Sequence, residues 1–222
     1  MAAESGIGLA STAHDSDSPT HATIASLVPH RRPLRINAWP DGARWSVVAE
    51  DVCEDLTLSS GDTDDLTQVA RAAHAWHTGA DLPELHRAAP FLRPTGRYEV
   101  PDHDPLHLVE SEWRALLAES RKPAEAGRRH RALVKAAYAE PRLRNLFPFT
   151  SHWALRFSTT TRPFMTLTGP ALLAFDDHYT VSAAFTGTPA LVETSTPEAA
   201  VAALLPHLPS PLPPIALGCK HG

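Results

Sequence analysis

The sequence predicts an α+β fold of two related halves, each running antiparallel strands into a capped amphipathic helix, with a helical pair between them. Two observations predict it. An alanine-rich segment with helical spacing occurs at residues 69–75, and a similar segment occurs at residues 133–139. Both are followed by the spacing Pro-x-Leu-x4-Pro-Phe. Segments in which apolar and polar residues alternate, as in half-buried strands, occur in both halves. Two copies are too few for a solenoid, so we expect two lobes or two sheets sharing a core.

Strands open the first half, residues 27–100. Alternation over residues 34–39 predicts one strand, and residues 44–48 are expected to form the next. The Pro-Asp-Gly sequence at residues 40–42 separates them, and its glycine permits the positive φ that tight hairpins need. Residues 55–59 are predicted to form a third strand.

A helix completes the first half. It is expected to begin near Asp62 or Thr63, whose side chains can cap free backbone N–H groups, and to stop at Gly79. Residues 81–107 carry five prolines, which predict a long connector. The boundary between the halves is therefore expected in this segment, between residues 100 and 101.

The helical pair and the second half occupy residues 101–208. The pair is expected at about residues 108–120 and 127–139. The last helix has strong start signals, because Thr196 can cap it and is followed by proline and glutamate. Strands are predicted between the pair and this helix, at residues 153–158, 164–168, 172–175, 179–185 and 190–193.

Both ends of the chain are predicted to lie outside the folded halves. Residues 1–26 are rich in small polar residues without a hydrophobic period, which predicts a disordered tail. Residues 209–222 form a proline-rich tail that cannot continue a helix or a central strand. We expect it to lie extended on the surface.

Composition excludes several classes of protein. A formal charge of −5 and a pI near 6.2 argue against nucleic-acid binding, which usually needs a basic surface. The two cysteines, Cys53 and Cys219, provide neither a disulfide framework nor a zinc site. No apolar run predicts a membrane span, and the first residues do not have the pattern of a signal peptide. The chain is therefore expected to be cytoplasmic and to bind no membrane.

Ser151 and His152 are the leading catalytic candidates. They come directly after the second Pro-Phe pair, where the first copy of the pattern has Leu92 and Arg93. An imidazole at the mouth of a strand can act as a general base near neutral pH, and Arg156 in the same strand is a third candidate. The alternative is that Ser151 serves a turn and His152 lies at a sheet edge.

Histidines occur in three patterns that suit metal or haem binding. His74 and His77 are three residues apart on a predicted helix, but packing is the alternative because His74 aligns with Tyr138 of the second copy. Residues 102–107 (Asp-His-Asp-x-x-His) and 176–178 (Asp-Asp-His) carry ligand types, yet both fall where turns are expected. We therefore assign no metal site and leave the cofactors open.

A basic cluster between the two helices of the pair is a candidate docking surface. Its predicted partner-binding residues are Arg128, Arg129 and Arg131, close to Arg121 and Lys122. Guanidinium groups bind phosphates and carboxylates through paired hydrogen bonds, so the cluster can dock an anionic partner such as a phosphopantetheinyl carrier protein. A solvated helix end is the alternative.

Aromatic residues near strand ends are candidates for lining an apolar pocket. Such residues suit a polycyclic or acyl substrate, and they equally suit the core of a sheet. The predicted substrate-binding residues are Trp45, Trp153, Phe164 and Tyr179.

Parts of this sequence resemble a known family. The stretch from Ala136 to Ser158, with Trp113-x-x-Leu116-Leu117 and Asp65-Leu66-x-x-Val69-Ala70, resembles an uncharacterised actinobacterial family labelled "natural product biosynthesis protein" around a domain of unknown function. The resemblance covers roughly residues 30–208. It implies a setting in secondary metabolism, but it implies no reaction and no catalytic residue.

Three functions are consistent with these patterns. The leading hypothesis is an accessory protein of bacterial natural-product biosynthesis that holds a biosynthetic intermediate in an apolar pocket, with a cofactor-independent cyclase or isomerase as one form of it. The second is a non-catalytic interaction module that docks a carrier protein or neutralises a partner. The third is a metal or haem enzyme that uses some of the 13 histidines. Whether the chain is an enzyme stays open at this point.

Overall fold

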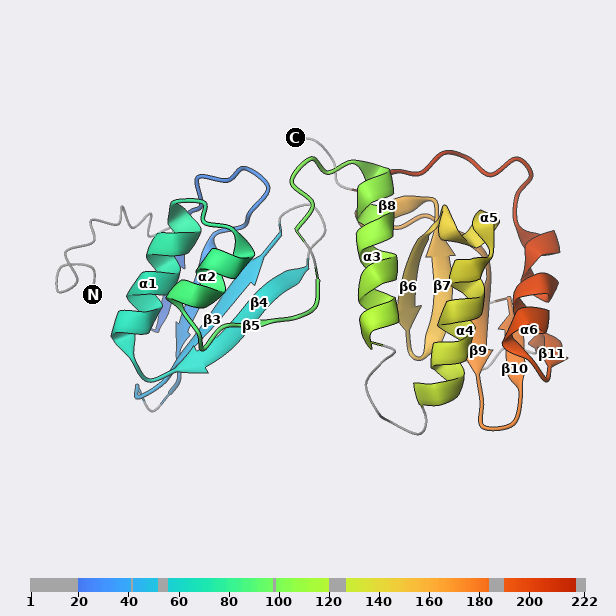
Figure 1. Cartoon of the computed structure of the whole chain (residues 1–222), viewed down its shortest axis with the longest axis horizontal. Coiled ribbons are helices and arrows are strands. Elements are labelled where there is room, and N and C mark those ends of the chain that lie inside the picture. Colours follow the sequence, from blue (N-terminus) through green and yellow to red (C-terminus); the bar gives the residue numbers. More distant parts are fainter. Residues whose placement is uncertain are drawn as a thin grey trace. The chain divides into compact units, whose positions relative to one another are not determined.

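The structure, a computed structural model, describes residues 20–40, 42–51, 56–97, 99–119, 127–183 and 190–218 (Figure 1). It divides into two compact units, Met1–Pro101 and Asp102–Gly222. Antiparallel sheets combine with helices in both units, which confirms the predicted α+β class. The boundary predicted from the sequence lies one residue before this division.

The N-terminal unit is a five-stranded antiparallel sheet, in the order β1-β2-β3-β4-β5, packed against helices. Ile36 and Val47 are partners on neighbouring strands, and both are buried in the core. Trp76 of α1 is also wholly buried, and its indole N–H donates to the carbonyl of Arg32 at 2.9 Å. The elements are β1 (His21–Ile24), β2 (Leu34–Ala38), β3 (Trp45–Glu50), β4 (Thr57–Thr63), α1 (Leu66–His77), α2 (Leu82–Ala88) and β5 (Arg93–Pro94).

The first helix begins later than predicted. Strand β4 continues through Thr63 because it stays paired with β3 that far, so a helix start at Asp62 or Thr63 is wrong. Asp65 caps α1 instead, accepting a hydrogen bond from a backbone N–H of the first turn at 2.8 Å. The helix ends at His77, and Gly79 follows with a φ of +81°.

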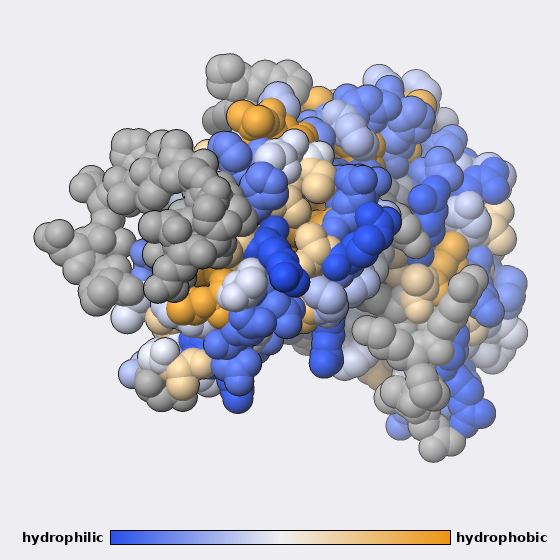
Figure 2. Space-filling model, turned by 60° about the vertical axis from the view of Figure 1, so that its left-hand side comes forward, coloured by the Kyte–Doolittle hydropathy of each residue, from blue (hydrophilic) through white to orange (hydrophobic). Residues whose placement is uncertain are grey.

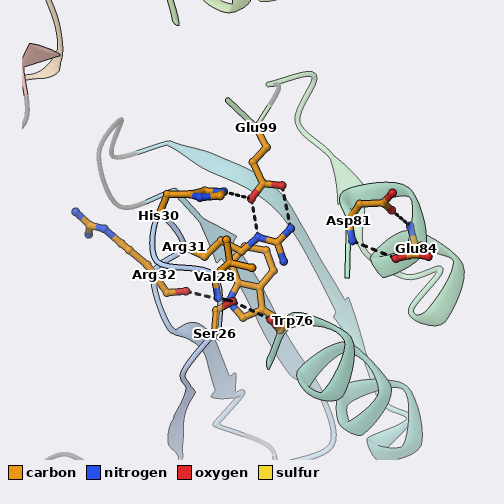
Figure 3. Close-up of polar contacts among 9 residues, drawn as sticks. All are labelled: Ser26, Val28, His30, Arg31, Arg32, Trp76, Asp81, Glu84 and Glu99. Atoms are coloured by element: carbon orange, nitrogen blue, oxygen red, sulfur yellow. Dashed lines mark hydrogen bonds and ion pairs between the residues drawn. The ribbon is translucent and has the colours of Figure 1, made fainter. Parts of the chain in front are cut away.

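Helix α2 lies inside the segment predicted to be a connector. The carboxylate of Asp81 accepts from the N–H of Glu84 at 2.7 Å, and the carboxylate of Glu84 accepts from the N–H of Asp81 at 3.3 Å (Figure 3). This reciprocal capping box starts the helix. Pro83 lies in the first turn, where a missing N–H breaks no helical hydrogen bond. The connector prediction is wrong for this part.

The disordered-tail prediction is also wrong in part. Residues 21–24 form β1, which pairs antiparallel with β2 over four residues. Strand β2 is therefore paired with a neighbouring strand on both of its edges, with β1 on one side and β3 on the other. Residues 1–19, both cysteines and Asp55 of the predicted third strand lie outside the described residues.

The C-terminal unit has helices on one face of a second five-stranded antiparallel sheet, in the order β11-β10-β9-β7-β6 (Figure 1). Strand β12 pairs with β8 in a small parallel sheet. The helices are α3 (Pro105–Glu119), α4 (Gly127–Ala139), α5 (Pro141–Arg144), α6 (Pro197–Leu204) and the 3-10 turn η1 (Leu205–His207). The strands are β6 (Phe147–Ser151), β7 (Ala154–Ser158), β8 (Thr160–Pro163), β9 (Leu167–Ala174), β10 (Tyr179–Ser182), β11 (Ala190–Thr194) and β12 (Ala216–Gly218).

Several predicted elements of this unit are present. The second predicted helix of the pair has the bounds of α4, and Thr196 caps α6 by accepting from the N–H of Ala199 at 3.2 Å. The strand predicted at residues 164–168 is wrong, because β8 ends at Pro163 and β9 begins at Leu167.

A proline-rich strap, residues 209–215, joins η1 to β12. It contains no helix or strand of its own, and it leads into a short strand that the sequence did not indicate. Gly218 makes this pairing possible, because a Cβ there would lie only 1.9 Å from the carbonyl oxygen of Thr161. At the other end, Arg142 donates to the carbonyls of Leu205 and Pro209 at 3.4 and 3.3 Å. The strap is therefore anchored on both sides.

Candidate functional site

An apolar groove of about 590 Å³ lies under the proline-rich strap of the C-terminal unit. Three segments that are distant in sequence line it, namely residues 104–106, 145–146 and 212–215. Leu106, Leu212 and Ile215 supply much of the apolar wall, together with the buried Leu146. Its size and its mainly apolar lining are those of small-molecule sites.

Two polar residues lie among the apolar ones in this groove. Asp104 caps α3, because its Oδ1 accepts from the N–H groups of Leu106 at 2.8 Å and His107 at 3.4 Å. Asn145 caps the end of α5 and is exposed. Among the described residues, the lining contains no His, Ser, Cys or Lys. This arrangement can hold an apolar molecule and orient one polar group of it, while the carboxylate of Asp104 is already engaged by backbone N–H groups.

The predicted substrate-binding aromatics do not line this groove. Trp45 belongs to the N-terminal unit, whereas Trp153, Phe164 and Tyr179 belong to the C-terminal unit. Tyr179 is only 4% exposed and packs in the core, while Trp153 and Phe164 are exposed by 76% and 62%. Strand alternation alone did not distinguish these environments.

The three predicted catalytic residues lie in different environments. Ser151 and His152 are side by side, with Ser151 Oγ 3.2 Å from His152 Nδ1, but His152 is exposed on a turn. Arg156 lies within β7 and is 6% exposed. None of the three lines the groove. Their catalytic assignment stays a prediction.

The predicted partner-binding arginines occupy the first turns of α4. Arg129 stacks its guanidinium over the ring of Tyr179 at 4.6 Å, which explains why that tyrosine is covered. Arg128 is exposed, and Arg131 is partly exposed. Arg121 and Lys122 of the predicted cluster lie outside the described residues.

The groups with metal-ligand residue types form local pairs. His107 Nδ1 lies 2.7 Å from Asp102 Oδ2, and His178 Nδ1 lies 2.6 Å from Asp177 Oδ1. The hydrogen bond and charge of Asp102 raise the pKa of His107. His77 bonds the carbonyl of Ala25 at 2.8 Å instead of sharing a ligand with its helical neighbour. Within the described residues, no group of three potential ligands is close enough to hold a metal ion.

A partly buried ion cluster lies in the N-terminal unit (Figure 3). Arg31 binds Glu99 through two hydrogen bonds of 2.6 and 2.9 Å, and His30 Nε2 lies 2.8 Å from the same carboxylate. The guanidinium also lies 4.5 Å from the ring of Trp76. Burial would raise the pKa of Glu99, but the bonds and charges of Arg31 and then His30 lower it overall. The cluster ties the end of the N-terminal unit to the loop after β1.

A serine–histidine contact in the N-terminal unit has a structural role. Ser59 Oγ lies 2.9 Å from His86 Nε2, a distance that suits a nucleophile and its base. However, Ser59 is fully buried and its hydroxyl donates to the carbonyl of Arg93 at 3.0 Å. Burial lowers the pKa of His86. The pair joins α2 to β4 and β5, and a substrate cannot reach Ser59.

Two further observations concern the hydrophobicity of the surface and the length of the helices. On the face shown in Figure 2, hydrophobic residues lie in small patches between hydrophilic ones. No helix in the described part of the chain is long and apolar enough to cross a bilayer.

Comparison with known proteins adds one finding. Residues 107–219 match the family described as "Family of unknown function (DUF6193)". No curated protein and no solved structure matches the chain. The matched segment contains α4, the second sheet and the proline-rich strap.

Proposed function

Since the chain belongs to the family of unknown function DUF6193, we propose a role from its groove: it is an accessory protein that binds an apolar small molecule under the proline-rich strap. The single observation that carries the proposal is the apolar groove of about 590 Å³. A hollow of this size and lining can bury most of a polycyclic or acyl molecule.

The anchoring of the strap supports binding of a defined ligand. β12 and Arg142 fix its two ends, so Leu212 and Ile215 are held in place before a ligand arrives. A preformed apolar wall lowers the entropic cost of binding. Because Asp104 and Asn145 are the polar groups of the lining, we propose retention and orientation of the ligand as the activity, in place of cyclisation or isomerisation.

The biological setting forms part of the same proposal. The resemblance of residues 136–158 to proteins labelled for natural-product biosynthesis supports a cytoplasmic role in actinobacterial secondary metabolism. The ligand would then be a biosynthetic intermediate with a ring system or an acyl chain.

Binding of two simple probes to the full chain tests the proposal. 2-Naphthol represents a ring ligand and decanoate an acyl ligand. Leu106 is 59% exposed, so Leu106→Glu places a charge in the groove without disturbing the core. We expect saturable binding of at least one probe to the unmodified protein and about tenfold weaker binding to Leu106→Glu, because an apolar contact is lost.

Leu191→Glu is the matched control. Leu191 is 45% exposed on β11, in the same unit but outside the groove lining, so its substitution should leave probe affinity unchanged. The proposal fails if neither probe saturates, or if the two variants weaken binding equally.

A further inference from the structure

An unusual hairpin joins β6 to β7. Ser151 pairs with Ala154, so only His152 and Trp153 form the turn. Their φ values are +50° and +67°. Two-residue turns with positive φ at both positions are common in hairpins because their backbone matches the twist of the strands. Asn-Gly is preferred in them because these two residues tolerate positive φ.

Trp153 is poorly suited to this backbone conformation. Bulky residues in the left-handed region are strained, and such strain persists where the surroundings impose it or a function requires it. The side chain is 76% exposed, and its indole makes no hydrogen bond or ring contact with any described residue. Packing among the described residues therefore does not explain the presence of tryptophan here.

Helix α4 has an unfavourable charge distribution of its own. It carries Arg128, Arg129 and Arg131 near its N-terminus, no acidic residue, and Lys135 further along. Cations are unfavourable at the positive end of the helix dipole. Nε and Nη2 of Arg129 and Nε of Arg131 are buried and lack a hydrogen-bond partner among the described residues. The helix is thus strongly basic in a chain of charge −5.

Both features lie at the same end of the C-terminal sheet (Figure 1). Leu155 of β7 pairs with Leu172 of β9, so the turn before β7 and the turn after β9 share one end. The second turn contains Phe175, 46% exposed and stacked on His178 at 4.8 Å. Tyr179 follows directly and lies under Arg129 of α4. We call this set of residues, 127–131, 152–153 and 175–178, the turn end.

We infer that the turn end is a docking surface for an acidic segment of a partner protein. Trp153 and Phe175 would receive apolar side chains of that segment, and its carboxylates would pair with Arg128 and Arg131. Carboxylates placed there would also interact favourably with the positive end of the α4 dipole, in addition to Asp177, which already interacts with Arg129. This surface is separate from the groove, so the inference does not depend on the proposed function.

A protein partner fits the turn end better than an anionic membrane or a nucleic acid. Asp176 and Asp177 lie in the same set and are exposed, with Asp177 paired to His178. A uniformly anionic surface would be repelled by these carboxylates, whereas a protein segment can place its acidic groups opposite the arginines alone. Exposed tryptophan and arginine are also the residue types that dominate protein interfaces.

Selection of ligands from a displayed library of random peptides tests the inference. The bait is the full chain, and the selected peptides are then measured against three variants. Arg128→Glu reverses a charge of the turn end, and Arg114→Glu is its control on the exposed side of α3. The double variant His152→Asn with Trp153→Gly replaces the turn by the preferred residues.

The inference predicts peptides enriched in acidic residues beside apolar ones, with affinity that falls as salt rises. Arg128→Glu and the turn variant should each weaken binding about tenfold, and Arg114→Glu should not. The turn variant should also raise Tm by about 4 °C, because it removes backbone strain. This opposite effect on stability and binding separates a functional tryptophan from a structural one.

Other outcomes overturn the inference. The inference fails if the selected peptides are not enriched in acidic residues, or if they bind the turn variant as tightly as the parent. It also fails if the turn variant is less stable than the parent. Vesicles of anionic phospholipid and a DNA duplex are tested in parallel. Binding to either one that is lost in Arg128→Glu, without selection of acidic peptides, would assign the surface to that other class of partner.

Discussion

At the scale of single residues, charges are placed in two contrasting ways. Arg31 is buried and Glu99 is partly buried, and two hydrogen bonds join them, although Nη1 of Arg31 has no hydrogen-bond partner among the described residues. Arg128 and Arg131 lie near the positive end of a helix with no acidic residue in that helix. The first arrangement stabilises the fold, and the second is unfavourable in isolation. An exposed basic helix end of this kind marks a region where an anionic partner can dock.

The Arg31–Glu99 pair predicts a pH dependence of stability. The pKa of Glu99 is lower in the folded state than its ordinary value of 4.5, so its contribution is present above that value and is lost as pH falls through the folded pKa. Glu99→Gln should reduce the free energy of unfolding at pH 7 by about 3 kcal/mol, because it leaves a buried guanidinium without its counter-charge. It should also flatten the loss of stability below pH 4.5.

Urea denaturation of both proteins between pH 3 and pH 7 measures this effect. Glu110→Gln is the control, since Glu110 forms an exposed pair with Arg114 on α3. Equal pH profiles for the parent and Glu99→Gln would show that Glu99 contributes nothing through its charge.

At the scale of elements, the proline-rich strap connects the fold to the proposed function. Its position depends on the pairing of β12 with β8, and that pairing depends on the absence of a side chain at Gly218. Gly218→Ala should detach β12, release Leu212 and Ile215 from the groove and weaken probe binding about tenfold. Tm should also fall, because Leu212 and Ile215 pack against the main core, whereas the main sheet and its helices stay intact.

Heteronuclear NMR of Gly218→Ala measures both effects, through the shifts of residues 212–218 and a titration with 2-naphthol. Gly42→Ala is a control for backbone strain alone, because a Cβ there meets nothing within 4 Å whereas its φ of +66° is unfavourable for a side chain, and it should leave the shifts of residues 212–218 and the probe affinity unchanged. Full affinity in Gly218→Ala would show that the strap is not part of the binding site.

The sequence predicted elements whose sequence pattern is local, and it missed elements that depend on pairing with a distant segment. Caps and periodicity are local, so α4 and the start of α6 were predicted well. Strands β5 and β12 have two and three residues, too few for any period, and exist only because a neighbouring strand pairs with them. Helix α2 was missed because its proline was taken as a breaker, although Asp81 and Glu84 carry a capping-box pattern.

The two candidate sites also differ in whether the sequence alone could identify their residues. The turn end contains residues that stood out in the sequence, because arginines in a row and an isolated tryptophan are visible without a structure. The groove was predicted only as an apolar pocket, and its residues were not identified. Its walls come from segments more than 100 residues apart, residues 104–106 and 212–215, which only tertiary folding brings together.

At the scale of the whole molecule, the two units have separate cores. The larger core cluster contains only residues from Val109 onward, and the other large cluster ends at Leu92. The groove and the turn end both lie in the C-terminal unit, which also contains the family match. A domain with its own core is expected to fold alone.

Residues 102–222 are therefore predicted to fold and to bind without the N-terminal unit. The separately expressed unit should unfold in one cooperative transition and bind 2-naphthol within about twofold of the full chain, because distant sites contribute independently. Calorimetry and the probe titration measure the two quantities. Residues 20–101, expressed alone, are the control and should show cooperative unfolding without probe binding. If residues 102–222 unfold gradually, the N-terminal unit is needed for their fold. If they fold but lose the probe, the N-terminal unit is needed for binding, and the groove alone does not define the site.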